Sequence, residues 1–205
     1  MASPERDEDR RPETIALLAV ALRPPVDASS YEAPFHDLRS AVGGTGPLST
    51  WIEEAGRRAR TVRMDREYHR LFLGPGRPIA PPFESVYRDR SMFGEAAKDF
   101  LRELRAVGLA PSEGFGLPPD HIALELEYVV QLDLRARDAG AHGRFEEAAL
   151  WSERSRTFVE DHLARWLPPF LRRLEEGAPG SPYTLVVRAA AELLRLRGPG
   201  PGRDP

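Results

Sequence analysis

Apolar residues recur every three or four positions through most of this chain, a spacing typical of amphipathic α-helices. In residues 93–107, for example, the apolar side chains fall on one side of the predicted helix. Similar patterns, bounded by proline or glycine, predict helices over residues 14–22, 31–42, 48–62, 67–73, 145–163, 166–176 and 183–196. No stretch alternates apolar and polar residues as a strand does. We therefore predict an all-α fold, a single helical bundle.

One predicted helix, residues 121–137, is apolar on every side rather than on one. Its apolar residues are Ile122, Leu124, Leu126, Tyr128, Val129, Val130, Leu132 and Leu134. A helix of this kind is normally buried among other helices. We expect it at the centre of the bundle.

The two ends of the chain differ from its middle. Residues 1–12 are charged and residues 198–205 are rich in proline and glycine, so we predict disordered tails around one domain, residues 13–197. Arg10-Arg11 followed by apolar residues 15–22 superficially copies an export leader. The apolar run is short, and Pro24-Pro25 follows it instead of a cleavage site. We interpret the run as the first helix of the domain.

Four prolines interrupt the helical pattern within residues 75–82. Proline lacks a backbone donor, so this segment cannot be a helix or an inner strand. It nevertheless carries apolar residues that a solvated linker would not need: Ile79, Phe83, Val86 and Tyr87. We predict a long, ordered loop held by its own side chains, with Phe83 and Tyr87 presenting a surface. Loops of this kind often carry function.

Composition excludes several classes of function. The net charge of −3 argues against a nucleic-acid-binding protein. The chain has no cysteine, which excludes disulfides, zinc-thiolate sites and iron-sulfur clusters. No apolar run approaches the ~20 residues that span a bilayer, so we expect no membrane insertion.

Catalytic motifs are missing as well. The five histidines show no metal-ligand spacing beyond a weak Glu160-x-His162 pair, and neither a nucleophile elbow nor a phosphate-binding loop occurs. We therefore predict no enzyme activity, no metal and no cofactor. A hydrolase acting through Asp120 and His121 is an alternative that the missing nucleophile disfavours.

Polar residues cluster at the start of the apolar helix. Asp120 follows two prolines and is a good N-cap, and Glu125 lies one turn after His121 on the same face. A buried carboxylate needs a partner, so Glu125 and Glu127 either form internal ion pairs or line a site. We favour an ion pair for Glu127 and a site for Glu125. Carboxylates there could also bind an arginine of a peptide.

Three blocks of sequence resemble the TorD/DmsD family of redox-enzyme maturation chaperones, which is related to the NarJ-type chaperones. The blocks are Glu67-Tyr-x-x-Leu-Phe-x-Gly-Pro75, Pro81-Pro-x-Glu-Ser-Val-Tyr87 and Pro119-Asp-His-Ile-Ala-x-Glu-Leu-Glu127. They follow the order of the family. One departure is Phe83, where many members have tryptophan or tyrosine.

This resemblance implies a cytoplasmic, non-catalytic chaperone. Such proteins bind the twin-arginine signal peptide and the apo form of a molybdenum-cofactor oxidoreductase, assist cofactor insertion and prevent premature export. Together with the residue pattern, it predicts a peptide site made of Phe83, Glu84, Tyr87, Asp120, His121 and Glu125. The alternative is an assembly module that binds a folded redox-enzyme subunit without recognising a leader.

Members of the family also differ in assembly and ligands. Some form domain-swapped homodimers, for which the glycine-bearing residues 109–119 are a reasonable hinge, so both a monomer and a swapped dimer are expected states. Some bind a guanine nucleotide, but no phosphate motif here supports that ligand.

Overall fold

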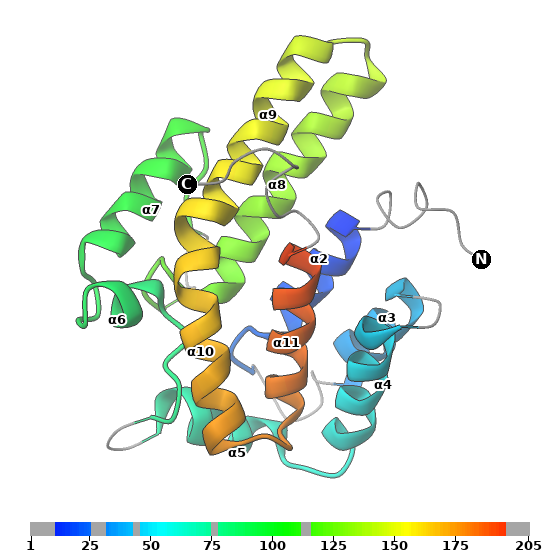
Figure 1. The fold of residues 1–205 in the computed structure, drawn as a ribbon, viewed down its shortest axis with the longest axis vertical. Coiled ribbons are helices and arrows are strands. Elements are labelled where there is room, and N and C mark those ends of the chain that lie inside the picture. The colour runs from blue at the N-terminus through cyan, green and yellow to red at the C-terminus, as the bar shows by residue number, and fades with distance from the viewer. Residues whose placement is uncertain (1–10, 26–31, 43–45, 75–77, 112–115, 196–205) are drawn as a thin grey trace, which may run out of the picture.

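The computed structural model describes residues 11–25, 32–42, 46–74, 78–111 and 116–195. Their regular structure is helical, with one isolated β-bridge, which confirms the predicted all-α class (Figure 1). Residues 1–10 and 198–205 of the expected tails, and residues 112–115 of the expected hinge, lie outside the described residues. The first described helix, α2, begins at Arg11, within the segment expected to be a tail.

One side of the bundle is formed by the N-terminal helices and the last helix. These are α2 (Arg11–Ala21), α3 (Glu32–Val42), α4 (Pro47–Ala59) and α11 (Pro182–Arg195). Helix α2 packs against α3, α8 and α11, and α4 packs against α3 and α11. The apolar faces predicted from the sequence meet in these contacts, so α2 is a core helix of the bundle.

At one end of the molecule, α5 (Met64–Tyr68) continues into the π-helical turn η1 (His69–Leu73). Tyr68, Phe72 and Tyr183 form a buried aromatic cluster, with ring centroids 4.8–5.6 Å apart in edge-on arrangements. Tyr68 and Phe72, which lie in the predicted helix of residues 67–73, are thus part of the core.

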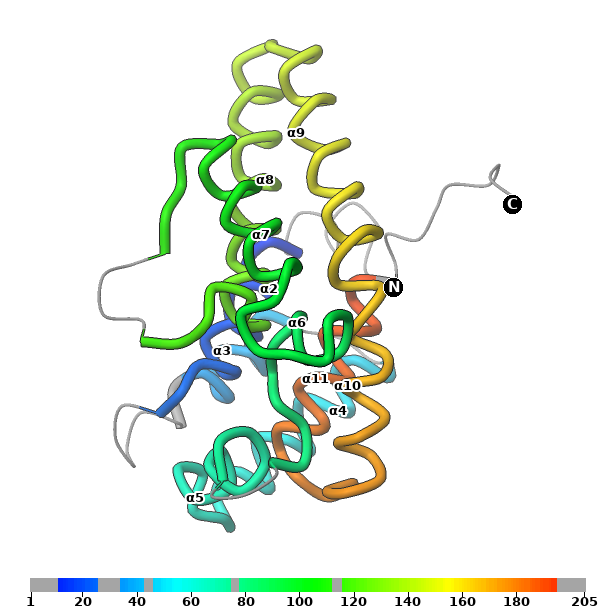
Figure 2. Tube along the Cα trace, turned by 90° about the vertical axis from the view of Figure 1, so that its left-hand side faces the viewer, coloured from blue at the N-terminus to red at the C-terminus, as the bar shows by residue number. Residues whose placement is uncertain are grey.

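Helices α7 (Glu95–Ala106), α8 (Ile122–Ala141) and α9 (Phe145–Phe158) form the other end. Helices α8 and α9 make an antiparallel hairpin that extends beyond the body (Figure 1), and α7 lies beside it (Figure 2). Gly143, at a positive φ of 72°, allows the tight turn between them. Most residues from Ile122 to Leu132 are buried, which confirms α8 as a central helix.

Helix α9 runs without a break through the π-helical turn η2 (Val159–Leu163) into α10 (Ala164–Gly177), as Figure 1 shows. The prediction that a new helix begins at Trp166 is wrong: Pro168 and Pro169 lie in the second turn of α10. They leave the carbonyls of Ala164 and Arg165 without the usual donors. Because both of those residues are exposed, water can hydrogen-bond to them.

The proline segment is an ordered loop where it is described, residues 78–83. Ala80 is buried, and its N–H donates to the Leu71 carbonyl at 2.9 Å. A short helix, α6 (Glu84–Arg88), follows directly, so the expectation that the whole segment is non-helical is wrong. The prolines end at Pro82, and nothing after it prevents a helical turn. Residues 75–77 lie outside the described part.

Each helix in the described part of the chain is too short or too polar to cross a membrane.

Candidate peptide-binding site

The proline segment and the start of α8 meet, as the sequence predicts. Phe83 and His121 form an antiparallel β-bridge. Two backbone bonds flank it: the Glu84 N–H donates to the Asp120 carbonyl, and the Ile122 N–H donates to the Pro82 carbonyl, both at 3.0 Å. Residues far apart in the sequence are thus fixed side by side.

The contact is buried rather than open. Phe83 is only 2% exposed, and its ring packs against the His121 imidazole at 5.4 Å, so the expectation that Phe83 presents a surface is wrong. Tyr87 is half-buried, stacks on Trp166 at 5.5 Å and lies under the Arg173 guanidinium at 4.9 Å. The loop aromatics therefore secure the loop to the helices.

His121, not Asp120, caps the start of α8. His121 is the N-cap of α8, and its Nδ1 accepts a hydrogen bond from the Ala123 N–H at 3.1 Å. Asp120 instead serves α6, where its Oδ2 accepts from the Ser85 N–H at 2.7 Å. Burial raises the pKa of the Asp120 carboxyl, although the bonds from Ser85 oppose the shift. The expected N-cap role of Asp120 at α8 is wrong.

His121 is held as a neutral imidazole. Because Nδ1 accepts from the Ala123 N–H, the ring proton lies on Nε2, which is 3.1 Å from the Tyr68 hydroxyl. Burial, with a smaller contribution from the positive charge of Arg23, lowers the pKa of His121 to about 3. The residue therefore does not carry a positive charge near neutral pH.

Two buried carboxyl groups connect α6 and α8 to the continuous helical run of α9, η2 and α10. Glu84 pairs with His162 of η2, Oε2 to Nδ1 at 2.8 Å, and with Arg88, Oε1 to a guanidinium nitrogen at 2.5 Å. Glu125 Oε2 accepts from Trp166 Nε1 at 2.9 Å. Glu125 thus lies at the same contact as the other predicted site residues. We call this contact, where α6 and the start of α8 meet η2 and α10, the seam.

Glu127, in contrast, pairs with Arg23 at 2.7 Å on the surface side of α8, and the predicted ion pair is confirmed.

Some polar atoms at this seam remain without partners among the described residues. They are Asp120 Oδ1, Glu125 Oε1 and Ser85 Oγ, all buried. Burial, together with the neighbouring negative charge of Glu84, raises the pKa of Glu125 well above its usual value. A group of three or more His, Asp or Glu side chains suited to hold a metal ion does not occur within the described ranges.

An open hollow lies beside this buried cluster. It has a volume of about 580 Å³ and lies between α7 and the helical run of α9 and η2. Its lining consists of Glu103, Glu147, Leu150, Trp151, Glu153, Arg154, Thr157, Phe158, Asp161 and His162. We call it the α7–α9 groove.

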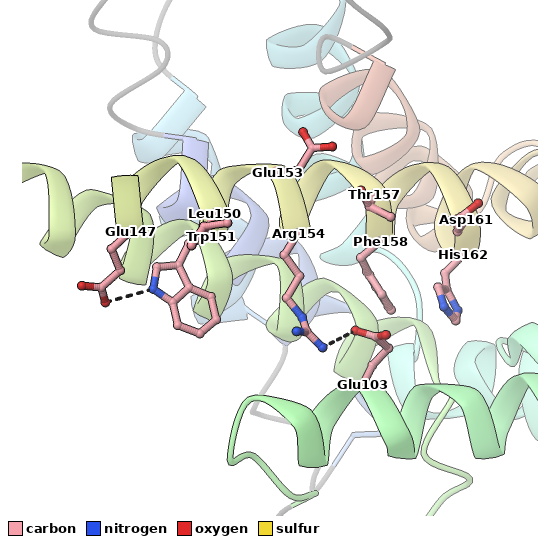
Figure 3. A pocket seen from close by; sticks show the side chains of 10 residues that line it. All are labelled: Glu103, Glu147, Leu150, Trp151, Glu153, Arg154, Thr157, Phe158, Asp161 and His162. Atoms are coloured by element: carbon pink, nitrogen blue, oxygen red, sulfur yellow. Dashed lines mark hydrogen bonds and ion pairs between the residues drawn. The ribbon is translucent and has the colours of Figure 1, made fainter. Parts of the chain in front are cut away.

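Figure 3 shows Trp151, Arg154, Phe158 and His162 projecting from α9 and η2 toward α7. Two hydrogen bonds hold polar groups of the α7–α9 groove in place. Arg154 donates to Glu103 of α7 at 2.8 Å, and Trp151 Nε1 donates to Glu147 at 3.2 Å. The lining combines apolar surface with four carboxylates and one arginine. Such a surface fits a segment that is partly apolar and partly basic.

His162 belongs both to the groove and to the buried cluster, since it lines the first and binds Glu84 of the second. Sequence reasoning missed the groove residues. Leu150 lies in an apolar run, Ala148 to Trp151, and its 71% exposure is a property of the folded molecule that the sequence pattern does not show. The spacing of Glu160 and His162 suggested only a weak metal motif and did not indicate that His162 lines a groove.

The fold and the site define an all-helical protein with a peptide-sized, acidic groove over a buried carboxylate cluster. The chain belongs to the nitrate reductase delta subunit family, whose model matches residues 27–172.

Similar proteins include named chaperones. The chaperone protein TorD of Vibrio cholerae is 27% identical over 135 residues, which cover 65% of this chain and 60% of TorD. The selenate reductase assembly chaperone protein of Thauera selenatis is 32% identical over 132 residues, 64% of this chain and 66% of that protein. These matches span less than two thirds of either relative. Their names agree with the expected non-catalytic role.

A solved structure shares the fold. The crystal structure of a candidate redox enzyme maturation protein from Archaeoglobus fulgidus superposes with a TM-score of 0.59 at 19% sequence identity. It covers 95% of this chain and 96% of that chain.

Proposed function

We propose that this protein is a maturation chaperone for a molybdenum-cofactor oxidoreductase. In this role it binds the twin-arginine leader and the apo form of its client in the cytoplasm, assists cofactor insertion and delays export. Membership of the family and similarity to TorD and to a selenate reductase assembly chaperone support the general role. Recognition of the leader is the finer part of the proposal.

The observation that carries leader binding is the lining of the α7–α9 groove. A leader of this class combines two arginines with an apolar stretch. The groove offers Leu150 and Trp151 to the apolar part of the leader. The carboxylates of Glu103 and Asp161, which pair with Arg154 and Arg165 in the free protein, would accept hydrogen bonds from the leader's guanidinium groups. Apolar contacts would supply most of the affinity, and the carboxylates would select the basic end.

Five of the six residues predicted from the sequence have a supporting role in this proposal. Phe83, Asp120 and His121 fix the proline segment to α8. Glu84 holds α6 to η2, and Glu125 holds α8 to α10. They thereby set the position of the groove wall at His162. Access of a leader to Tyr87, which is half-buried, is part of the same proposal.

A leader peptide should bind, and its arginines should matter. Replacing both arginines of a synthetic leader by alanine is expected to weaken binding by about tenfold or more, because charge-assisted hydrogen bonds to the groove carboxylates are lost. Isothermal titration calorimetry of the full chain with both peptides measures the difference. Equal affinity for the two peptides would contradict leader recognition.

The groove itself is tested by a lysine at Leu150. Leu150→Lys should weaken binding of the arginine leader by about tenfold, because it removes an apolar contact and repels the basic end. Since Leu150 is largely exposed, the circular dichroism and melting temperature should hardly change.

Phe145→Lys is the matched control for that variant. Phe145 is 74% exposed on the same helix but does not line the groove, so leader binding should stay within about twofold of the wild type. Its exposure also favours the alternative function, docking of a folded redox-enzyme subunit on the end of the α8–α9 hairpin. That alternative predicts the reverse ranking: Phe145→Lys would lose the partner and Leu150→Lys would not.

A further inference from the structure

The protein already holds one of its own arginines at the edge of the α7–α9 groove. Arg88, the last residue of α6, donates from one guanidinium nitrogen to Glu84 Oε1 at 2.5 Å and to the Asp161 carbonyl at 3.3 Å. Asp161 lines the groove, and so does His162, which binds the other oxygen of Glu84. The Arg88 side chain is 28% exposed, whereas Glu84 is fully buried. Arg88 thus reaches from the surface to a buried acceptor.

The carboxylate that Arg88 binds lies beside a second buried carboxyl group. Glu84 binds Arg88 and His162, and burial, together with the negative charge of Glu84, raises the pKa of the neighbouring Glu125. Asp120 Oδ1, also buried, has no hydrogen-bond partner among the described residues. A guanidinium at Glu84 therefore offsets negative charge that would otherwise be buried without a cation.

We propose that Glu84 and the Asp161 carbonyl form a guanidinium-binding site, that Arg88 occupies it in the free protein, and that an arginine of the client's leader displaces Arg88 when the leader binds. This inference rests on the proposed leader recognition and adds its regulation: the chain's own arginine competes with the ligand.

The exchange conserves charge at the buried carboxylate. One guanidinium leaves Glu84 and another replaces it, so the buried carboxylate stays paired throughout. Arg88 is already partly in water and can extend into it without a large change in packing. A leader that lacks arginine could not make the exchange. The contact between Arg88 and Glu84 therefore makes binding selective for peptides that carry a guanidinium group.

Removing the competitor should strengthen leader binding. Arg88→Gln is expected to bind an arginine leader about tenfold more tightly than the wild type, because the leader no longer has to break a charge-assisted bond. Affinity for the same peptide with both arginines changed to alanine should not change. Calorimetry with a synthetic 25-residue leader in Arg-Arg, Lys-Lys and Ala-Ala forms measures both, and the Lys-Lys form should gain less.

Arg102→Gln is the matched control. Arg102 pairs with Asp99 on α7, and neither of these two residues lines the groove or contacts Glu84. It removes the same charge, so a general electrostatic effect would raise affinity equally in both variants. The displacement proposal requires a gain in Arg88→Gln alone, and equal gains, or a gain shared by the Ala-Ala peptide, would overturn it.

A measurement on the wild type covers the case in which Arg88→Gln does not fold. The ¹⁵Nε resonance of Arg88 should move to the position of a solvated arginine when the arginine leader is added. Leader binding without any change at Arg88 would refute the displacement while leaving leader recognition intact. If neither wild type nor Arg88→Gln binds the leader, both proposals fail together.

Discussion

Replacing Trp166 by alanine is expected to lower the free energy of unfolding by about 3–5 kcal/mol. Trp166 is fully buried in α10, with its ring 5.5 Å from that of Tyr87 and 5.4 Å from that of Phe170. Its indole N–H also donates to Glu125. The substitution therefore creates a large cavity and removes the only described donor to a buried carboxyl oxygen. Urea unfolding followed by circular dichroism measures the loss.

Trp166→Phe separates the two contributions. It keeps a ring in the cavity but removes the N–H, so it should cost less than the alanine variant. Trp151→Ala is the matched control: Trp151 is half-buried at the groove, and its removal should cost clearly less. A loss below about 1 kcal/mol for Trp166→Ala would show that Trp166 does not hold the seam together.

The helical architecture could be predicted because it depends on local patterns. The all-round apolar run of α8 indicated a central helix, and the one-sided runs of α7 and α11 indicated helices packed on one face. The continuity of α9, η2 and α10 could not be predicted in this way. Whether Pro168 and Pro169 end a helix depends on whether the carbonyls that they leave without donors reach water, and this is a property of the folded molecule.

The sequence correctly predicted that the proline segment meets the start of α8, but it wrongly predicted that Phe83 is exposed. The order of the three motifs brought Phe83 and Asp120-His121 together, and the β-bridge bears this out. Burial of Phe83 was missed because the prolines indicate only that the segment is not helical. They do not show that the Pro82 carbonyl accepts a hydrogen bond from α8 and brings Phe83 against it. The groove was missed because its lining comes from helices whose relative placement no local pattern specifies.

Acid should destabilise the protein through His121. The pKa of this residue is lowered from its ordinary value of 6.5 to about 3, mainly by burial. Below pH 6.5 the unfolded chain binds a proton that the folded protein does not, so stability is full above pH 6.5 and falls as the pH drops toward 3. From pH 6.5 to pH 5, this residue alone should remove about 2 kcal/mol of the free energy of unfolding.

Two buried carboxyl groups, Asp120 and Glu125, make the stability change with pH in the opposite sense to His121. Burial raises the pKa of Asp120 and Glu125, so each contributes stability that is full below its unfolded pKa and is lost as the pH rises. Over the same pH range they offset part of the His121 effect. The pH dependence of the wild-type free energy of unfolding therefore does not show the contribution of His121 alone. That contribution requires the difference in free energy of unfolding between the wild type and a His121 variant.

His121→Asn provides that difference. Asparagine keeps an oxygen that can cap α8 but cannot titrate, and it loses the contact with Tyr68, so it should be less stable than the wild type at pH 7. The gap between the two proteins should then shrink by about 2 kcal/mol on going from pH 6.5 to pH 5. Glu125→Gln should differ from the wild type most at the alkaline end instead, where the native carboxyl is hardest to keep protonated. A constant difference in stability between wild type and His121→Asn across this range would mean that His121 binds its proton equally well in the folded and unfolded states. That outcome is incompatible with a buried ring whose Nδ1 accepts from Ala123.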